Sequence, residues 1–277
     1  MNIKIGYFVE LFIHYLLDHF KPFFSSIANI IEGFMVGTES VLLFLPPLVF
    51  IGSLVIFAWI FTSRKIAFFS FFGLLLVFGM GLWISFIQTF VLVLVAGFFS
   101  LFLGIPIGIL CSKSKHTDRI LTPTLDFMQT MPPFVYLIPA VMFFGIGQVP
   151  AVISTVIFAM PPAIRLTRLG LNQVPDELIE VGNSFGFTPF ELLLKIQLPM
   201  ALPSIMAGVN QSIMLSLSMV VIASMIGASG LGSNVLNGIQ KMEIGVGFEA
   251  GLSVVILAIM LDRITSNIKF GKKNINK

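Results

Sequence analysis

The sequence has few charged residues for its length. Only 10% of its 277 residues are Asp, Glu, Lys or Arg, whereas roughly 25% is usual in a soluble domain. Hydrophobic residues make up 57% of the chain, and its mean hydropathy is +1.01. A soluble fold of this size could not cover its surface with so few charges. The composition therefore argues against a soluble enzyme, a disordered protein or a nucleic-acid binder, and it favours a protein that lies in lipid.

Several chemical motifs are also absent from the sequence. Cys111 is the only cysteine, which excludes an internal disulfide and a cysteine-rich metal site. No G-x-x-x-x-G-K-[ST] phosphate loop is present, so the chain is not expected to bind ATP by that route. No plausible catalytic triad or metal-ligand spacing stands out. His14 and Asp18 lie four residues apart, but we interpret them as part of a solvated helix face rather than as a metal site.

Long charge-free runs divide the chain into predicted membrane spans. About 20 apolar residues are needed to cross the hydrocarbon core as a helix. We predict seven spans, at residues 41–61, 66–86, 90–111, 127–147, 150–166, 204–225 and 248–266. Turns are expected at Gln88–Thr89 and at residues 145–148, and the glycine- and serine-rich residues 227–247 are expected to connect the last two spans.

The first 40 residues differ from the rest. Polar residues recur there at helical spacing, and large apolar residues fill the other faces; the polar set is Glu10, His14, Asp18 and Lys21. We predict an amphipathic helix at the outer membrane interface. No small-residue cleavage pattern of a signal peptide follows it. The predicted organisation is an interfacial segment at 1–40, a transmembrane domain at 41–268 and a basic cytoplasmic tail at 269–277.

The distribution of Lys and Arg predicts the orientation of the chain. Cytoplasmic loops of membrane proteins collect these residues. If residues 172–200 lie inside and the spans alternate, 13 of the 16 Lys and Arg residues are cytoplasmic. The three exceptions are Lys4, Lys21 and Lys241. This asymmetry predicts a multi-pass protein with its N-terminus outside and its C-terminus in the cytoplasm.

The predicted spans contain no evident energy source for transport. Transport driven by protons or Na⁺ usually requires ionisable groups within the spans. Asp126, Glu249 and Asp262 all fall at predicted span ends, where water can solvate them, although Glu249 could face a cavity. The protein is therefore either a passive channel or a pathway that another subunit drives.

Residues 172–200 form the most polar long segment and predict two short helices around a glycine turn. A proline and acidic residues at 175–180 are typical of a helix start. Gly186 suits the left-handed position that ends such a helix. Thr188 and Glu191 have the spacing of a capping box, and apolar residues continue the second helix up to the next proline. A cytoplasmic loop with this much local order is expected to dock on a partner.

This segment resembles the "EAA" coupling loop of binding-protein-dependent ABC importer permeases, which have the MetI-like transmembrane fold. The residues that carry the resemblance are Glu180, Gly186 and Ile196-Gln197-Leu198-Pro199. The family loop usually has two alanines after the glutamate, where this chain has Val181 and Gly182. Glycine weakens a helix by about 1 kcal/mol relative to alanine, so we expect a looser first coupling helix.

Three longer stretches are similar to the permeases of glycine betaine/proline (quaternary ammonium) ABC importers. They are LDFMQTMPPFVYLIPA at residues 125–140, IFAMPPAIR at 157–165 and AGVNQSIM at 207–214. With the coupling loop, the similarity extends over residues 40–268. It implies an all-α, polytopic MetI-like permease that is not itself an enzyme.

The resemblance also implies partners. Two copies of the permease would pair around a central path in the bacterial inner membrane, and two ATPase subunits would grip the two 172–200 loops. A separate extracytoplasmic binding protein would deliver the solute. ATP and Mg²⁺ would be bound by the ATPases, so the permease itself would need no cofactor. Nucleic acid is not expected as a partner.

The residues implied for coupling to the ATPase are Glu180, Gly186, Phe187, Leu198 and Pro199. Candidates for the translocation path are Met128, Met131, Pro132, Pro133, Tyr136, Met160, Pro161, Pro162, Asn210 and Met214. Aromatic and thioether groups suit trimethylammonium ligands, and the proline pairs are expected to break helices beside a water-filled path. For any single Met, core packing is the competing interpretation, and Asn210 could instead bond to a helix of its own chain.

Three alternatives remain open from the sequence. The chain could be an ABC permease for choline, carnitine or another small solute such as methionine or a sulfonate. It could be a secondary osmolyte transporter, which would work without an ATPase. It could be an osmotically gated channel, although that leaves the ordered cytoplasmic loop unexplained.

Overall fold

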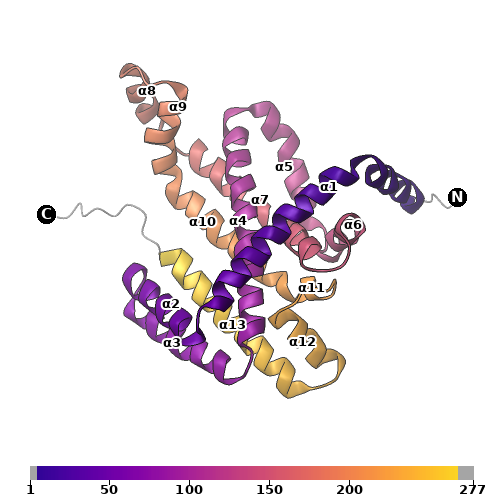
Figure 1. The fold of residues 1–277 in the computed structure, drawn as a ribbon. Helices are drawn as coiled ribbons and strands as arrows, with labels where there is room; N and C mark the ends of the chain where they lie inside the picture. The colour runs from indigo at the N-terminus through magenta and orange to yellow at the C-terminus, as the bar shows by residue number, and fades with distance from the viewer. Residues whose placement is uncertain (1–4, 268–277) are drawn as a thin grey trace.

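The computed structural model describes residues 5–267, which are almost entirely helical (Figure 1). The N-terminal half consists of α1 (Ile5–Phe44), α2 (Pro47–Phe61), α3 (Arg64–Gly79), α4 (Trp83–Lys113), α5 (Lys115–Thr130) and α6 (Phe134–Phe144). The C-terminal half consists of α7 (Gln148–Asn172), α8 (Asp176–Ser184), α9 (Pro189–Leu192), the π-helical turn η1 (Leu193–Gln197), α10 (Leu198–Ser218), α11 (Val220–Ser224), α12 (Leu231–Gln240) and α13 (Ile244–Asn267). The described residues contain no β-strand, so the all-α prediction is confirmed.

The first helix runs without a break across the predicted boundary at residue 40. It is kinked at Phe20, two residues before Pro22, and it ends only at Phe44. Pro46 is extended and Pro47 begins α2, because a proline disfavours helical geometry in the residue before it. The prediction of one span over residues 41–61 is therefore wrong. The interfacial position of the N-terminal segment stays a prediction, and the tail at 269–277 lies outside the described residues.

The turn before α4 also lies elsewhere than predicted. It falls at Met80–Leu82, where Gly81 adopts φ +72°, and not at Gln88–Thr89. Those two polar residues are inside α4 because each finds a partner there. Gln88 donates a hydrogen bond to Glu39 of α1, and the Thr89 hydroxyl accepts the backbone N–H of Leu231. Satisfied polar groups can lie within a helix in an apolar environment, so polarity alone did not locate the turn.

Helices α4 and α7 form the centre of the bundle and run in the same direction. The Ser100 hydroxyl donates to the Val156 carbonyl, and further along Gly104 approaches Ala163 and Gly108 approaches Thr167. A methyl group on Gly108 would lie 2.7 Å from both the Ile164 carbonyl oxygen and the Thr167 Cβ. Small residues at such contacts let membrane helices approach closely, and here they bring α7 against α4.

We expect Gly108→Ala to destabilise the protein by about 1–3 kcal/mol, because the new methyl group would collide with backbone that cannot move aside. The matched control is Gly97→Ala on the same helix, whose methyl group would meet only Ile213 at 3.8 Å, an ordinary contact. Thermal unfolding in detergent would compare the two variants. Equal unfolding temperatures would contradict the close α4–α7 contact.

The segment between α4 and α7 is sharply bent. Helices α5 and α6 meet at an angle of 101°, with the break at Met131, which is extended before the Pro132–Pro133 pair. The chain then turns through Gly145 and Gly147, both at positive φ, as predicted for residues 145–148. The predicted span at 127–147 is thus a bent pair of helices, each shorter than a full span.

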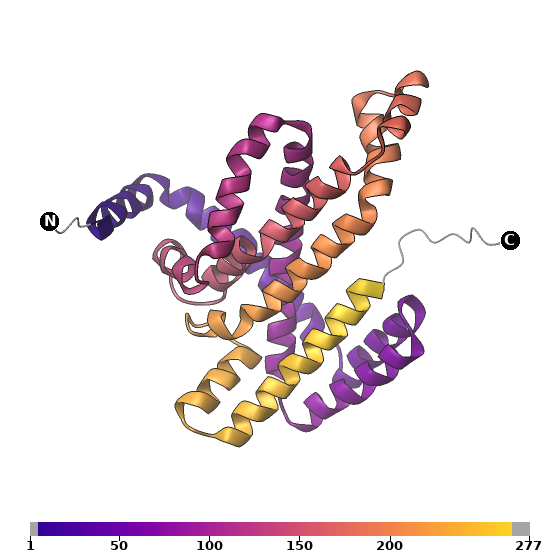
Figure 2. The same cartoon turned by 180° about the vertical axis from the view of Figure 1, so that it is seen from behind.

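The count of seven spans is not confirmed. Within residues 5–267, five helical stretches are long and apolar enough to cross a membrane, or six if α5 and α6 together count as one. Helices α2 and α3 have 15 and 16 residues, which corresponds to roughly 22–24 Å of helix. They pair as a short hairpin. The predicted connection at 227–247 contains α12, which packs beside α13 (Figure 2).

The turns of the bundle gather at two opposite ends (Figure 2). The α2–α3 turn, the α4–α5 junction, the α8–α9 hairpin and the end of α13 lie toward one end. The α3–α4 and α12–α13 turns lie toward the other. Lys and Arg residues concentrate at the first end, at positions such as Arg64, Lys113 and Lys195, whereas Lys241 lies at the second. The basic residues are therefore distributed unevenly between the two ends of the bundle.

Candidate functional site

Helices α8 and α9 form a hairpin that projects from one end of the bundle (Figure 1). Gly186 provides the turn with φ +74°, a conformation that costs other residues energy. Thr188 then caps α9: its hydroxyl accepts the backbone N–H of Glu191, and the Glu191 carboxylate accepts the backbone N–H of Thr188. The predicted glycine turn and capping box are both confirmed.

Gly182 holds the two arms of this hairpin close together. It is buried, and a methyl group there would lie 2.6 Å from Leu192 and 2.8 Å from Ile196. The expectation of a looser helix considered only the intrinsic helix propensity of glycine. In the structure the missing side chain lets the second arm pack directly on α8, a contact that helix propensity does not describe.

The second arm continues into the bundle instead of ending at Pro199. After α9 the chain forms the π-helical turn η1, in which the Leu198 N–H donates to the Leu193 carbonyl, and α10 follows without interruption. Proline has no N–H and its ring collides with the carbonyl four residues earlier in a regular helix. The wider π turn accommodates that ring. Pro199 thus lies in the first turn of α10, and one continuous helical stretch joins the hairpin to the bundle.

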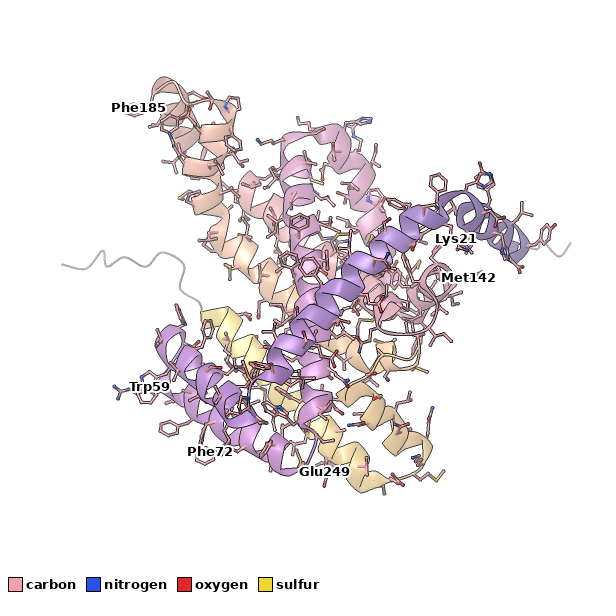
Figure 3. The ribbon with its side chains drawn as sticks, in the orientation of Figure 1. Lys21, Trp59, Phe72, Met142, Phe185 and Glu249 are labelled. Carbon is pink, nitrogen blue, oxygen red and sulfur yellow. The ribbon has the colours of Figure 1, made fainter. Side chains whose placement is uncertain are left out.

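The tip of the hairpin exposes large apolar side chains. Phe185 is 77% exposed and Phe190 is 66% exposed, beside the Gly186 turn (Figure 3). Phe187, the aromatic residue chosen from the sequence, is instead partly buried under the Lys195 ammonium, which lies 4.9 Å from its ring centre. Lys195 also pairs with Glu191 at 2.8 Å. Phe187 therefore organises the hairpin, while its neighbours face outward, where a partner can cover them.

Of the other coupling candidates, one is exposed and one is packed against the bundle. Glu180 is exposed on α8, and its backbone carbonyl accepts the Ser184 hydroxyl. Leu198 is partly buried and packs against the small cluster of Leu171, Leu193, Ala201 and Ile205. Through this cluster the hairpin contacts the end of α7 and the start of α10. A force applied at the tip would consequently reach two helices of the bundle.

Two ion pairs join α5 to α7, and neither was predicted from the sequence. Arg168 contacts Asp118 at 2.7 Å and the Thr122 hydroxyl at 3.0 Å, and Arg165 pairs with Asp126. The acceptors at 118, 122 and 126 share one face of α5 at i, i+4, i+8 spacing, and two arginines face them from α7. The sequence shows two acidic residues eight positions apart on α5 and two arginines three positions apart on α7, which does not by itself indicate that the two helices lie side by side.

The methionines proposed for the path occupy mixed environments. Met128 and Met160 both pack on a cluster of Cys111, Leu125 and Ile164 between α4, α5 and α7, which agrees with the competing interpretation as core residues. Met131 is partly buried at the α5–α6 break, and Met214 on α10 is 36% exposed. Tyr136 is buried, and no hydrogen-bond partner for its hydroxyl is found among the described residues.

The two proline pairs behave differently. Pro132 and Pro133 lie at the sharp α5–α6 break, as expected for a broken helix. Pro161 and Pro162 are buried inside the unbroken helix α7, so the expectation of a second break is wrong. Helix α10 passes close by, since a methyl group on Gly208 would lie 3.3 Å from the Pro162 carbonyl oxygen. Helix α10 therefore covers α7 at its prolines.

Asn210 takes part in a hydrogen-bond network within its own chain. Its amide donates to the Asp262 carboxylate at 3.1 Å and accepts the Thr265 hydroxyl at 2.6 Å. Of the two arrangements considered from the sequence, the structure shows the intrachain one, whereas the adjacent Gln211 is exposed. Asp262 is therefore held by α10 rather than by water alone. Glu249 is exposed near the start of α13 (Figure 3).

The arrangement is that of a membrane permease: apolar helices packed with the sharply bent α5–α6 pair, and an ordered hairpin outside the bundle. Residues 104–269 match the family model described as "Binding-protein-dependent transport system inner membrane component". The chain belongs to this family. It is consequently a transport subunit of an ABC importer and not an enzyme, and ATP hydrolysis takes place on a separate subunit.

Several curated relatives match nearly the whole chain. The glycine betaine transport system permease protein OpuAB of Bacillus subtilis is 48% identical, over 99% of this chain and 97% of its own length. The glycine betaine/carnitine transport permease protein GbuB of Listeria monocytogenes is 50% identical, over 93% and 92%. The glycine betaine/proline betaine transport system permease protein ProW of Escherichia coli is 45% identical, over 92% of this chain and 72% of its own.

A solved structure supports the fold independently. A chain of the MetNI methionine ABC transporter in an inward-facing conformation superposes with a TM-score of 0.60 over 68% of this chain and 96% of that one. The identity is 23%, so this likeness bears on the fold alone. The MetI-like fold expected from the sequence is thereby confirmed.

Proposed function

We propose that this chain is the membrane subunit of an ATP-driven importer of glycine betaine and related quaternary ammonium solutes. The main support is that the chain is 45–50% identical, over nearly its full length, to permeases named for glycine betaine. The ordered hairpin agrees with this, because its exposed Phe185 and Phe190 suit docking to a partner. The helical bundle provides the path for the solute, and the hairpin receives the movement of the ATPase.

The proposed assembly contains two copies of this permease, two ATPase subunits and a separate extracytoplasmic binding protein. ATP and Mg²⁺ are bound by the ATPases, and one hairpin docks in each. ATP binding draws the hairpins together, and the bundle switches from inward to outward access. Glu180, Gly186, Phe187, Leu198 and Pro199 are proposed as the coupling residues. Of the path candidates, those exposed at the α5–α6 break and on α10 are favoured, because a partner subunit or solute can reach them.

We further propose that the hairpin lies in the cytoplasm, that the C-terminus is cytoplasmic and that the N-terminus is outside. The concentration of Lys and Arg at the hairpin end of the bundle supports this orientation. A cysteine introduced at Lys241 should react with a membrane-impermeant maleimide in whole cells, and one introduced at Lys195 should react only after the membrane is opened. The variant Cys111→Ser provides the cysteine-free background for both.

The substrate class is tested by competition. The permease would be reconstituted with its ATPase and binding protein, and uptake of labelled glycine betaine would be measured against excess proline betaine, carnitine, choline, proline and methionine. We expect inhibition by the betaines and carnitine and none by methionine. Inhibition by methionine, or ATP-dependent uptake of methionine with no uptake of glycine betaine, would reject the substrate assignment.

A further inference from the structure

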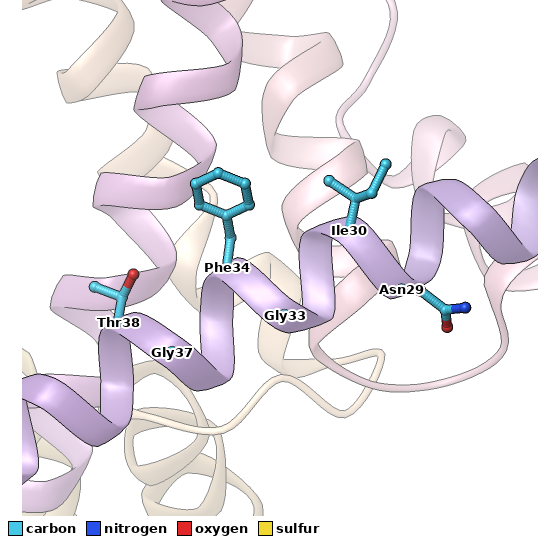
Figure 4. Close-up of a pocket in the computed structure, with 6 residues that line it drawn as sticks. All are labelled: Asn29, Ile30, Gly33, Phe34, Gly37 and Thr38. Carbon is cyan, nitrogen blue, oxygen red and sulfur yellow. The ribbon is translucent and has the colours of Figure 1, made fainter.

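Two of the hollows that border helix α1 differ in construction. The first is an open groove along one face of α1, lined by Asn29, Ile30, Gly33, Phe34, Gly37 and Thr38 (Figure 4). All six of these residues belong to α1. The second is a cavity of about 340 Å³ between α1, the α6–α7 connection and the start of α7; it is open on one side, where Glu32 and Ile146 are exposed. Its volume is near the lower end of the roughly 300–1,000 Å³ usual for small-molecule sites, and several elements build its walls.

The α1 wall of this cavity carries a carboxylate. Glu32 is the only charged residue between Lys21 and Glu39, and it lines the cavity together with Met35 and Val36. Among the described residues, no hydrogen bond or ion pair holds its side chain. Glu39, further along the same helix, accepts a hydrogen bond from Gln88. Glu32 is exposed and lies on the stretch of α1 that is apolar enough to cross a membrane. An ionisable group at membrane depth usually serves a ligand or a pathway.

The opposite wall has the complementary polarity. Helix α7 begins at Gln148, and the residue before it, Gly147, provides no side-chain cap. The Gly147 N–H donates to the Ile226 carbonyl at 2.9 Å, which fixes the connection, while the N–H groups of Gln148 and Val149 belong to the first turn and have no acceptor within the helix. A helix start carries partial positive charge and favours anionic groups. The cavity thus has an anionic side and a positively polarised side.

Aromatic rings complete the anionic side. Phe144 lines the cavity, and its ring packs edge-on against Phe24 of α1, with 5.7 Å between centroids. Phe143 stacks on the same Phe24 ring at 4.5 Å but does not line the cavity. Aromatic faces attract quaternary ammonium groups, which cannot donate a hydrogen bond to a carboxylate. Phe24 holds α1 against α6 and so keeps Glu32 beside Phe144.

We propose that this cavity binds a small zwitterion that carries a quaternary ammonium group. The ammonium group lies against Glu32 and Phe144, and the anionic group faces the start of α7. A bare cation would leave the α7 start unmatched, and a bare anion would be repelled by Glu32, so the two walls together select a dipolar solute. This inference rests on the proposed function, because it places solutes of that class at a site within the permease.

Saturation-transfer NMR on the methyl protons of glycine betaine would test the site. The permease–ATPase complex would be held in lipid nanodiscs without binding protein. We expect saturable binding that Glu32→Gln weakens by about tenfold through loss of the charge. Asp18→Asn should cause no change, because this control carboxylate is also exposed on α1 but does not line the cavity. Phe144→Leu should weaken binding about threefold, and Phe143→Leu should not.

Three outcomes would overturn the site: no saturable binding to the wild-type complex, equal affinity in Glu32→Gln and wild type, or equal effects of Phe144→Leu and Phe143→Leu. The last pair guards against a folding defect, because both changes remove a contact with Phe24. Uptake by the wild-type complex separates this inference from the proposed function. If uptake of glycine betaine fails, the function is wrong; if uptake is normal and Glu32→Gln binds like wild type, only the site is wrong.

Discussion

Replacing both exposed rings at the hairpin tip should abolish transport. In the double variant Phe185→Asp, Phe190→Asp, two side chains that are 77% and 66% exposed become charged, so the fold of the isolated permease is largely unaffected. Docking to the ATPase should be strongly weakened, because burying an unpaired carboxylate in an apolar interface costs several kcal/mol. We expect at least a hundredfold loss of ATPase association in pull-down, roughly 3 kcal/mol, and no ATP-dependent uptake.

The control for this experiment lies at the other end of the bundle. Met242 and Ile244 in the α12–α13 turn are 87% and 86% exposed, and Met242→Asp, Ile244→Asp adds the same charge there. This variant should keep normal ATPase association. Wild-type association by the hairpin variant would show that Phe185 and Phe190 do not contact the ATPase. Equal losses in both variants would mean that net charge, and not the docking surface, is responsible.

Gly186→Val should separate ATP hydrolysis from transport. The residue has φ +74°, and a non-glycine residue in this region is destabilised by roughly 1–2 kcal/mol, more for a β-branched side chain. No atom lies within 4 Å of the position that a new Cβ would take, so the penalty is one of backbone conformation alone. The variant should insert and assemble, but the two arms should lose their fixed angle. We expect about tenfold slower uptake, with ATP hydrolysis no longer stimulated by solute-loaded binding protein.

Gly81 provides an unusually close control. It has φ +72°, and a Cβ added there would likewise meet no atom within 4 Å, yet it forms the α3–α4 turn far from the hairpin (Figure 2). Gly81→Val should lower the unfolding temperature as much as Gly186→Val does. It should leave the coupling of ATP hydrolysis to uptake intact. Similar uncoupling in both variants would contradict a specific role of the hairpin turn.

The hairpin was the best predicted part of the molecule because its geometry is specified locally. The capping box of Thr188 and Glu191 and the left-handed Gly186 depend on residues only a few positions apart. The role of Gly182 could not be predicted in this way. Its effect depends on Leu192 and Ile196 from the other arm, and helix propensity does not describe such a contact. The same limit applies to Phe187, which is covered by Lys195.

The span boundaries were predicted less well because charge-free runs do not show where a helix breaks. Pro46 and Gly81 lie at helix breaks inside such runs. Residues of the same types, such as Pro161 and Gly104, lie inside unbroken helices, so residue type alone does not locate the breaks. Other features require tertiary structure. Thr89 lies inside a helix because Leu231 reaches it from 142 positions away, and the intrachain network of Asn210 depends on how α10 meets α13.

The central claim is that this permease moves solute only when a separate ATPase acts on the hairpin. The most direct measurement compares liposomes that contain the permease alone with liposomes that also contain the ATPase and binding protein. Labelled glycine betaine is supplied at the binding-protein side and ATP at the hairpin side. The account predicts accumulation only in the complete, ATP-supplied liposomes. Accumulation by the permease alone, driven by an ion gradient or by none, would contradict it.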